Sequence, residues 1–144
     1  MEFINDVGCG AHRTRFNRPG MVTKMNYEDI KKLLLSVDDP VTRLEMVMDL
    51  GTCLAPVPDD AVCNEITGCA SHVEICRLGN HFYGVADSAI VRGIVAIMIA
   101  MVDGKSPNEI RQMDLMGLFR ALDINIGAGR LNGVNSMIRF LQNL

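Results

Sequence analysis

Cys69 is the residue whose type and position are best suited to chemistry. It follows Gly68 in the stretch Thr67-Gly68-Cys69-Ala70-Ser71-His72-Val73, between a polar segment and a short apolar run. Glycine adopts backbone conformations that other residues resist, so this stretch predicts a turn. A thiol on a turn can be reached by another molecule, and its thiolate form is a nucleophile. The sequence therefore predicts one working sulfur at position 69.

Metal binding is the first alternative, because four potential ligands lie close together: Cys63, Cys69, His72 and Cys76. Zinc ribbons and fingers rely on tight pairs of ligands, and this sequence has no second pair such as C-x2-C. In an alternating strand, residues 72 and 76 share one face and residue 69 lies on the other. We therefore predict no metal site.

A catalytic Cys–His pair is the second alternative, since a nearby imidazole can activate a thiol. His72 and His81 are the histidines of the expected folded part. The sequence supplies no third, orienting group and no oxyanion hole. Partly exposed strand positions are the simpler interpretation of both histidines, and a small buried hydrophobic role suits Cys53 and Cys76.

The stretch Gly127-Ala128-Gly129-Arg130-Leu131-Asn132-Gly133 is the third candidate. Its G-x-G start is typical of dinucleotide-binding loops, but no strand precedes it and no acidic residue follows, so that interpretation fails. Arg130 would stand near the start of a helix, where a cation opposes the helix dipole. This position predicts either a solvated arginine or one that meets an outside partner.

The elements that hold Cys69 begin with two helices and a hairpin. Helices are expected over 26–37 and 40–51, the first capped by Asn26 and the second by Asp39 before Pro40. Alternation predicts a strand over 73–78. Gly79-Asn80 then reads as a turn, and Phe82 to Val85 as the returning strand.

The rest of the chain predicts further helices. A long buried helix begins after Asp87 or Ser88 and ends near Val102, and Ser106 to Glu109 form a capping box for the next one. A short helix follows over 114–122. After a bend at Gly127 and Gly129, an apolar stripe over 131–141 marks a final helix.

Composition limits the function. The chain has 144 residues, which favours one domain, and its net charge of −3 with 5% aromatic residues gives no general attraction to nucleic acid or anionic membrane. Five cysteines without a secretory signal predict free thiols in a reducing compartment, the cytoplasm. Residues 1–24 lack apolar periodicity and are expected to be a disordered leader or a foreign remnant, with a single domain over 25–144.

The chain resembles the SufE family of sulfur acceptors, which are partners of cysteine desulfurases in iron–sulfur cluster assembly. The resemblance runs from about Tyr27 to Leu141 and rests on four pieces in the right order. These are Arg43-Leu44 with Asp49-Leu50-Gly51, Gly68-Cys69-Ala70-Ser71-His72-Val73, Asp87-Ser88-Ala89-Ile90-Val91-Arg92-Gly93, and Gly129-Arg130-Leu131-Asn132-Gly133-Val134-Asn135-Ser136-Met137-Ile138.

The resemblance implies an α+β fold, SufE/IscU-like, with a small antiparallel sheet of about three strands packed against several helices. It implies that Cys69 accepts sulfane sulfur as a persulfide from a pyridoxal-phosphate desulfurase, stimulates that enzyme and passes the sulfur on for cluster assembly. The chain would be a sulfurtransferase-like carrier without a cofactor of its own. The candidates for partner binding or gating are Gly68, Ser71, His72, Asp87 and Arg130.

Two alternatives stay open beside sulfur transfer. An iron–sulfur scaffold needs about three or four ligands presented together, and Cys63 and Cys76 are the extra thiols near Cys69. A regulatory adaptor would act on the desulfurase without carrying sulfur. The expected partners are a cysteine desulfurase and a cluster scaffold. Glu74 stands where family members often carry tryptophan, and the helix over 90–102 is expected to cover the sulfur.

Overall fold

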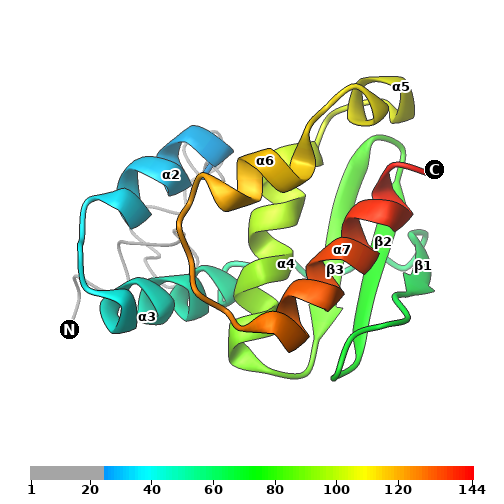
Figure 1. Ribbon diagram of the computed structural model, residues 1–144. Coiled ribbons are helices and arrows are strands. Elements are labelled where there is room, and N and C mark those ends of the chain that lie inside the picture. Colours follow the sequence, from blue (N-terminus) through cyan, green and yellow to red (C-terminus); the bar gives the residue numbers. More distant parts are fainter. Residues whose placement is uncertain (1–24) are drawn as a thin grey trace, which may run out of the picture.

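A three-stranded antiparallel sheet and a set of helices make up residues 25–144, the part of the chain that this computed structural model describes (Figure 1). The strands are β1 (Val62–Glu65), β2 (Val73–Leu78) and β3 (His81–Ala86), in the spatial order β1-β2-β3. This confirms the predicted α+β class. The expected leader, residues 1–24, lies outside the described residues.

The first two helices are α2 (Tyr27–Leu35) and α3 (Pro40–Gly51). Both predicted caps are confirmed, because the side chains of Asn26 and Asp39 accept hydrogen bonds from backbone N–H groups of their own first turns. Helix α2 ends two residues earlier than expected, where the Ser36 N–H bonds the Leu33 carbonyl in a tighter turn.

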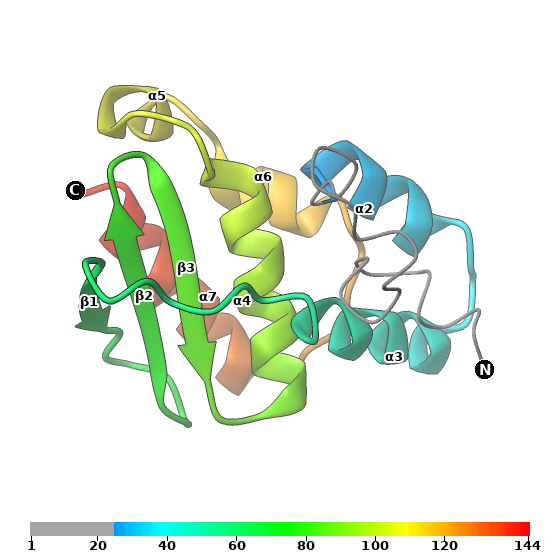
Figure 2. The same ribbon diagram turned by 180° about the vertical axis from the view of Figure 1, so that it is seen from behind.

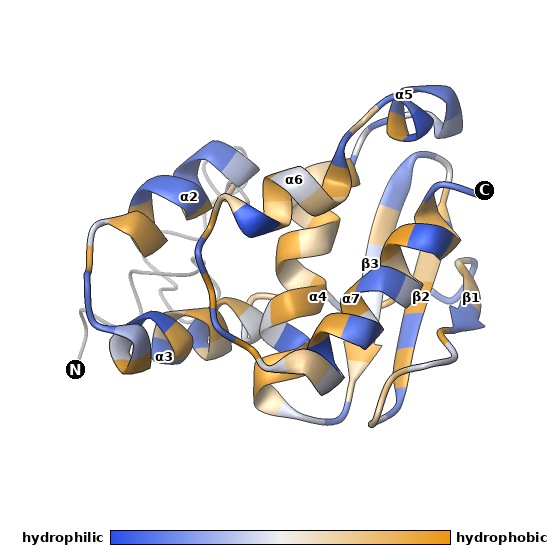
Figure 3. Cartoon of the chain, in the orientation of Figure 1, coloured by the Kyte–Doolittle hydropathy of each residue, from blue (hydrophilic) through white to orange (hydrophobic). Residues whose placement is uncertain are grey.

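Helix α4 (Ala89–Val102) is the centre of the core. Ser88 rather than Asp87 provides its cap, by accepting from the Val91 N–H. Figure 3 shows the helix as mostly apolar, and eight of its residues are buried. It packs against α3 so closely that a Cβ atom on Gly93 would lie 2.0 Å from the Val47 carbonyl oxygen. The sequence prediction of a buried helix is therefore confirmed.

The chain ends with α5 (Pro107–Arg111), α6 (Leu115–Arg120) and α7 (Ala128–Leu141). The predicted capping box of Ser106 and Glu109 is present. Helix α7 begins three residues before the expected start, since Ala128 and Gly129 are helical and the bend is confined to Gly127, with its φ of 85°. Among residues 25–144, no helix combines the length and apolar composition that a bilayer crossing requires.

The two faces of the sheet differ. Helices α4 and α7 cover one face, which we call the inner face (Figure 1). The chain between α3 and β1 runs across the opposite, outer face (Figure 2). Strand β1, whose residues are all exposed, pairs antiparallel with β2. Because all four residues are exposed, β1 has no alternating pattern from which a strand could be predicted.

The register of β1 and β2 corrects one expectation. Cys63 and Cys76 are directly opposite each other, and they form a disulfide. Cys53 is disulfide-bonded as well. The prediction of free thiols is therefore wrong for these three residues, because it rested on the cysteine count and the lack of a secretory signal and took no account of strand pairing.

Arg43 fastens the helical part of the domain. Its side chain is buried, with 8% of the residue exposed. The guanidinium donates to the carbonyls of Leu34, Val37 and Asp123, and it pairs with the Asp123 carboxylate at 3.2 Å. It thus joins the end of α2 to the turn after α6, and the Arg43-Leu44 piece of the sequence has a structural role.

Replacing Arg43 with methionine should lower the free energy of unfolding by about 3 kcal/mol, because buried carbonyl groups lose their donor. Urea unfolding followed by circular dichroism measures the change. Arg139→Met, at an exposed position of α7, is the matched control and should leave the free energy of unfolding nearly unchanged. Equal stability of the two variants would contradict the fastening role.

Candidate functional site

Cys69 lies at the centre of the connection between β1 and β2, residues 66–72. The Ile66 N–H donates to the Val73 carbonyl at 2.8 Å and extends the strand ladder to the base of this connection. Gly68 has a φ of 89°, in the left-handed region that favours glycine. Cys69 therefore sits at the tip of a β-hairpin, as the sequence predicts, and a glycine shapes that tip.

The tip is seated on helix α7. The Cys69 Sγ atom lies 3.9 Å from the Gly133 carbonyl oxygen, which accepts a weak hydrogen bond from the thiol. A Cβ atom on Gly133 would come within 3.2 Å of that sulfur, and one on Gly68 within 2.5 Å of the Ser136 Oγ atom. The hairpin tip and α7 thus approach each other where both lack side chains.

This seat hides part of the sulfur. Cys69 is half-buried and packs against the edge of the hydrophobic core. Burial raises the pKa of the Cys69 thiol above its ordinary value. At neutral pH the sulfur is therefore held as a thiol whose proton points to a carbonyl acceptor. The acceptor belongs to α7, whereas the sequence led us to expect cover from the helix over 90–102.

Cys69 is the free thiol of the described residues, because the other cysteines between positions 25 and 144 are disulfide-bonded. A free thiol is available for nucleophilic attack on sulfur, whereas a disulfide sulfur is not. The sequence placed several candidate thiols near the tip, and among them the folded chain leaves Cys69 as the free thiol.

His72 is occupied by two carboxylates. Its Nε2 atom lies 2.6 Å from Glu74 Oε2, and its Nδ1 atom lies 3.2 Å from Glu65 Oε2. The hydrogen bond with Glu74, followed by that with Glu65, raises the pKa of His72. Because both ring nitrogens have carboxylate partners, His72 is not placed to take a proton from Cys69. The arrangement argues against a Cys–His pair.

The remaining site candidates gather at the same end of the sheet. Asp87 follows β3, and its N–H donates to the His72 carbonyl at 3.3 Å. Ser71 is half-buried within the hairpin connection. In Figure 1 the β1–β2 and β3–α4 connections and the first turns of α7 all lie at this end.

Arg130 comes from that part of α7. It is exposed, and its Nη1 atom donates to the Ile126 carbonyl at 3.3 Å. It precedes Gly133 by three residues, so both lie on one side of the helix. The structure thus brings Arg130 to the side of α7 on which Cys69 is seated.

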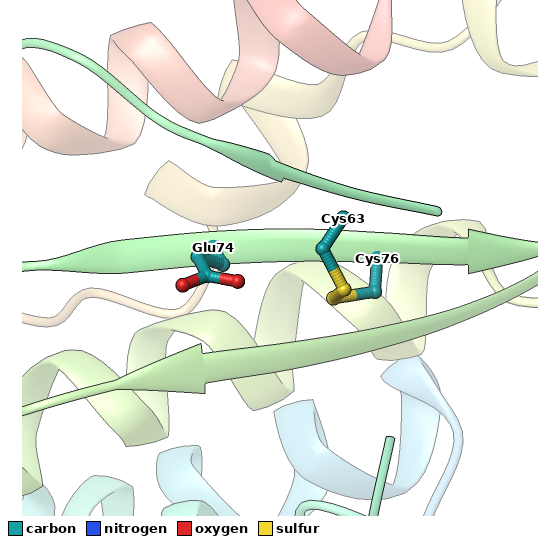
Figure 4. Close-up of side chains that lie close together, drawn as sticks. All are labelled: Cys63, Glu74 and Cys76. Carbon is teal, nitrogen blue, oxygen red and sulfur yellow. A yellow bond between two sulfur atoms is a disulfide. The ribbon is translucent and has the colours of Figure 1, made fainter. Parts of the chain in front are cut away.

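Sequence reasoning did not single out Gly133 and Ser136 as site residues. Both belong to the Gly129–Ile138 piece of the sequence, but only the folded chain shows that they lie beneath the hairpin tip. A second group of chemically active side chains lies on the outer face, where Cys63, Glu74 and Cys76 present ligand atoms within 4.8 Å of one another (Figure 4). That group does not include Cys69.

Comparisons with known proteins agree on one family. The SufE family model, described as an Fe-S metabolism associated domain, matches residues 28–144. An uncharacterised SufE-like protein of Rhizobium meliloti (strain 1021) is 32% identical over 115 residues, covering 72% of this chain and 82% of the relative. One from Rhizobium etli is 31% identical, with 72% and 78% covered. The sulfur acceptor protein CsdE of Escherichia coli (strain K12) is 31% identical over 111 residues, with 68% and 76% covered.

The seat of Cys69 can be tested by Gly133→Ala. The added methyl group would lie 3.2 Å from the sulfur and loosen its contact with α7, so alkylation of Cys69 by iodoacetamide should become several-fold faster. Alanine favours a helix by about 1 kcal/mol over glycine, so the melting temperature should not fall much. Peptide mass spectrometry after timed labelling measures the rate.

Gly129→Ala is the matched control, because a Cβ atom at this position of the same helix meets nothing within 4 Å. The control should leave the labelling rate of Cys69 unchanged. An equal rate in the two variants would show that Gly133 does not define the seat.

Proposed function

The chain belongs to the SufE family, and from this membership we propose that it accepts sulfane sulfur on Cys69 from a cysteine desulfurase and passes it on for iron–sulfur cluster assembly. The observation that carries the proposal is a free thiol at a hairpin tip, half-hidden against α7. The name of the Escherichia coli relative, a sulfur acceptor protein, supports the same reaction. We place this activity in the cytoplasm.

The chemical step is a transfer between sulfurs. The Cys69 thiol loses its proton, and the thiolate attacks the terminal sulfur of the persulfide on the desulfurase cysteine. A new S–S bond forms on Cys69 as the donor S–S bond breaks, and the donor cysteine leaves as a thiolate. The products are a persulfide on Cys69 and a free donor cysteine, with no net oxidation. Pyridoxal phosphate belongs to the desulfurase, and the acceptor needs no cofactor for this step.

The resting site opposes this reaction until the partner arrives. Burial keeps Cys69 protonated, and the Gly133 carbonyl can accept a hydrogen bond but cannot donate one to a thiolate. The sulfur must therefore leave its seat to become reactive. Gly68, with its positive φ, is where the backbone of the tip can rotate. The same seat protects a loaded persulfide from small thiols and oxidants.

Docking of the desulfurase would use the surface around the tip. Gly68 and Ser71 belong to the tip, Asp87 and His72 lie at its base, and exposed Arg130 flanks it on α7. Arg130 and Asp87 offer charges of opposite sign that fix the orientation of a partner. Such contacts change the association rate more than they change the stability of the free protein.

The two alternatives differ in what Cys69 does. A cluster scaffold needs several ligands around one site, but Cys63 and Cys76 are bonded to each other on the outer face of the sheet. A regulatory adaptor would stimulate the desulfurase even without the Cys69 sulfur. Measuring both sulfur loading and desulfurase stimulation in one variant separates these functions.

Cys69→Ser should abolish sulfur loading, because the hydroxyl does not form a persulfide. Intact-mass measurement after incubation with a cysteine desulfurase and cysteine should show a gain of one sulfur atom on the unmodified protein and none on the variant. The double variant Cys63→Ser/Cys76→Ser is the control and should still load. Full desulfurase stimulation by Cys69→Ser would instead favour the adaptor.

Arg130→Ala should weaken binding to the desulfurase about tenfold and leave the melting temperature nearly unchanged, because the residue is exposed and its hydrogen bond to the Ile126 carbonyl is long, at 3.3 Å. Arg139→Ala is the matched control. Residue 139 lies on the opposite side of the same helix and is also exposed. Calorimetric titration with the desulfurase measures both. Equal affinity of the two variants would remove Arg130 from the docking surface.

A further inference from the structure

A group of thiols and carboxylates occupies the outer face of the sheet, on the side away from α4 and α7. Cys63 on β1 is opposite Cys76 on β2, and Glu65 is opposite Glu74 in the same register. Figure 4 shows the Glu74 carboxylate and the Cys63–Cys76 disulfide on the same side of β2. One ligand atom from each of Cys63, Glu74 and Cys76 lies within 4.8 Å of the others.

The carboxylates make this face attractive to cations. Glu65 and Glu74 carry like charges directly opposite each other, an arrangement that destabilises a strand pair. His72 hydrogen-bonds both carboxylates and so holds Glu74 in place through one oxygen. A carboxylate has a second oxygen with which it can ligate. Positioning of this kind is what hydrogen-bonding partners provide for ligands in metal sites.

We propose that reduction of the Cys63–Cys76 disulfide turns this face into a binding site for a divalent, thiophilic cation such as Zn²⁺, with Cys63, Cys76 and Glu74 as its ligands. A dithiol reductant supplies two electrons and two protons to the disulfide and becomes a disulfide itself. When the cation binds, each of the two new thiols releases its proton and ligates as a thiolate.

The geometry and chemistry suit zinc. Two thiolates and one carboxylate oxygen, completed by water, form a tetrahedral set with Zn–S distances of about 2.3 Å and Zn–O distances of about 2.1 Å. Bound thiolates therefore lie almost 4 Å apart, and the ligand atoms of Cys63, Cys76 and Glu74 lie within 4.8 Å of one another. Cys76 is fully buried and is held in place by the fold. Cys63 is exposed, so the cation can reach the site from that side.

This site is separate from the proposed sulfur-accepting residue. None of its ligands is Cys69. Its two cysteines are not available as thiolates while they form a disulfide with each other. Sequence spacing failed to identify it because the set combines Cys63, Cys76 and Glu74 across two strands rather than Cys69 and His72 along one segment. The inference does not depend on the proposed function, and its test uses no desulfurase.

The experiment is a titration of the full-length protein with Co²⁺, a coloured probe for zinc sites. The protein is reduced with dithiothreitol, freed of reductant without air, and compared with the untreated protein. The reduced protein should bind one Co²⁺ per chain with an intense thiolate-to-cobalt absorption band, and Zn²⁺ should displace it. The untreated protein should show no such band. Absence of the band after reduction would overturn the proposal.

Variants identify the ligands. Cys63→Ser should halve the thiolate band or remove it, and because Cys63 is exposed the fold should survive, which circular dichroism checks. Glu74→Gln should weaken Co²⁺ binding about 10-fold to 100-fold. Cys69→Ser and Cys53→Ser are the controls and should keep the full band. A band of full intensity in Cys63→Ser, or one that disappears in Cys69→Ser, would assign the metal to other thiols and refute the site.

Discussion

The close approach of the β1–β2 hairpin tip to helix α7 is the constraint on which the site depends. A methyl group at Gly68 would lie 2.5 Å from the Ser136 Oγ atom and one at Gly133 would lie 3.2 Å from the Cys69 Sγ atom, so a side chain at either position would force the opposite segment to adjust. The contact joins residues far apart in the chain and fixes the sulfur beside a carbonyl rather than beside a base. The buried helix α4 and the paired strands hold the hairpin tip and α7 at this distance.

The disulfide and the free thiol lie in different surroundings. Its inner face belongs to the apolar core, where Ile75, Phe82 and Ala86 are buried together with residues of α4. Its outer face carries the paired cysteines and the carboxylates bridged by His72. Cys69 lies beyond the end of both faces, on the hairpin connection. A free thiol and a disulfide can thus occupy one short segment in different environments.

Local signals account for most of the fold that could be predicted. The caps at Asn26, Asp39 and Ser106 and the Gly79-Asn80 turn depend on neighbouring residues, and the structure confirms them. Strand β1 lacks an alternating pattern because all its residues are exposed. The disulfide followed from the register of that strand, which no local pattern encodes.

The candidate site likewise combines one feature that is encoded locally with one that is not. Gly68 predicted the turn that carries Cys69, since a positive φ is a property of one residue. The contact between Cys69 and Gly133 could not be predicted from periodicity, because these two residues are 64 positions apart in the sequence.

The disulfide also closes the chain into a covalent ring that contains Cys69. Cys63 and Cys76 are 13 residues apart, and the tip lies midway between them. In such a ring both ends of the segment that carries Cys69 are fixed at the disulfide, so the length of the ring limits how far the Cys69 sulfur can move. Any movement of Cys69 toward a partner is then a bend within residues 66–72, and β1 stays attached to β2 while it happens.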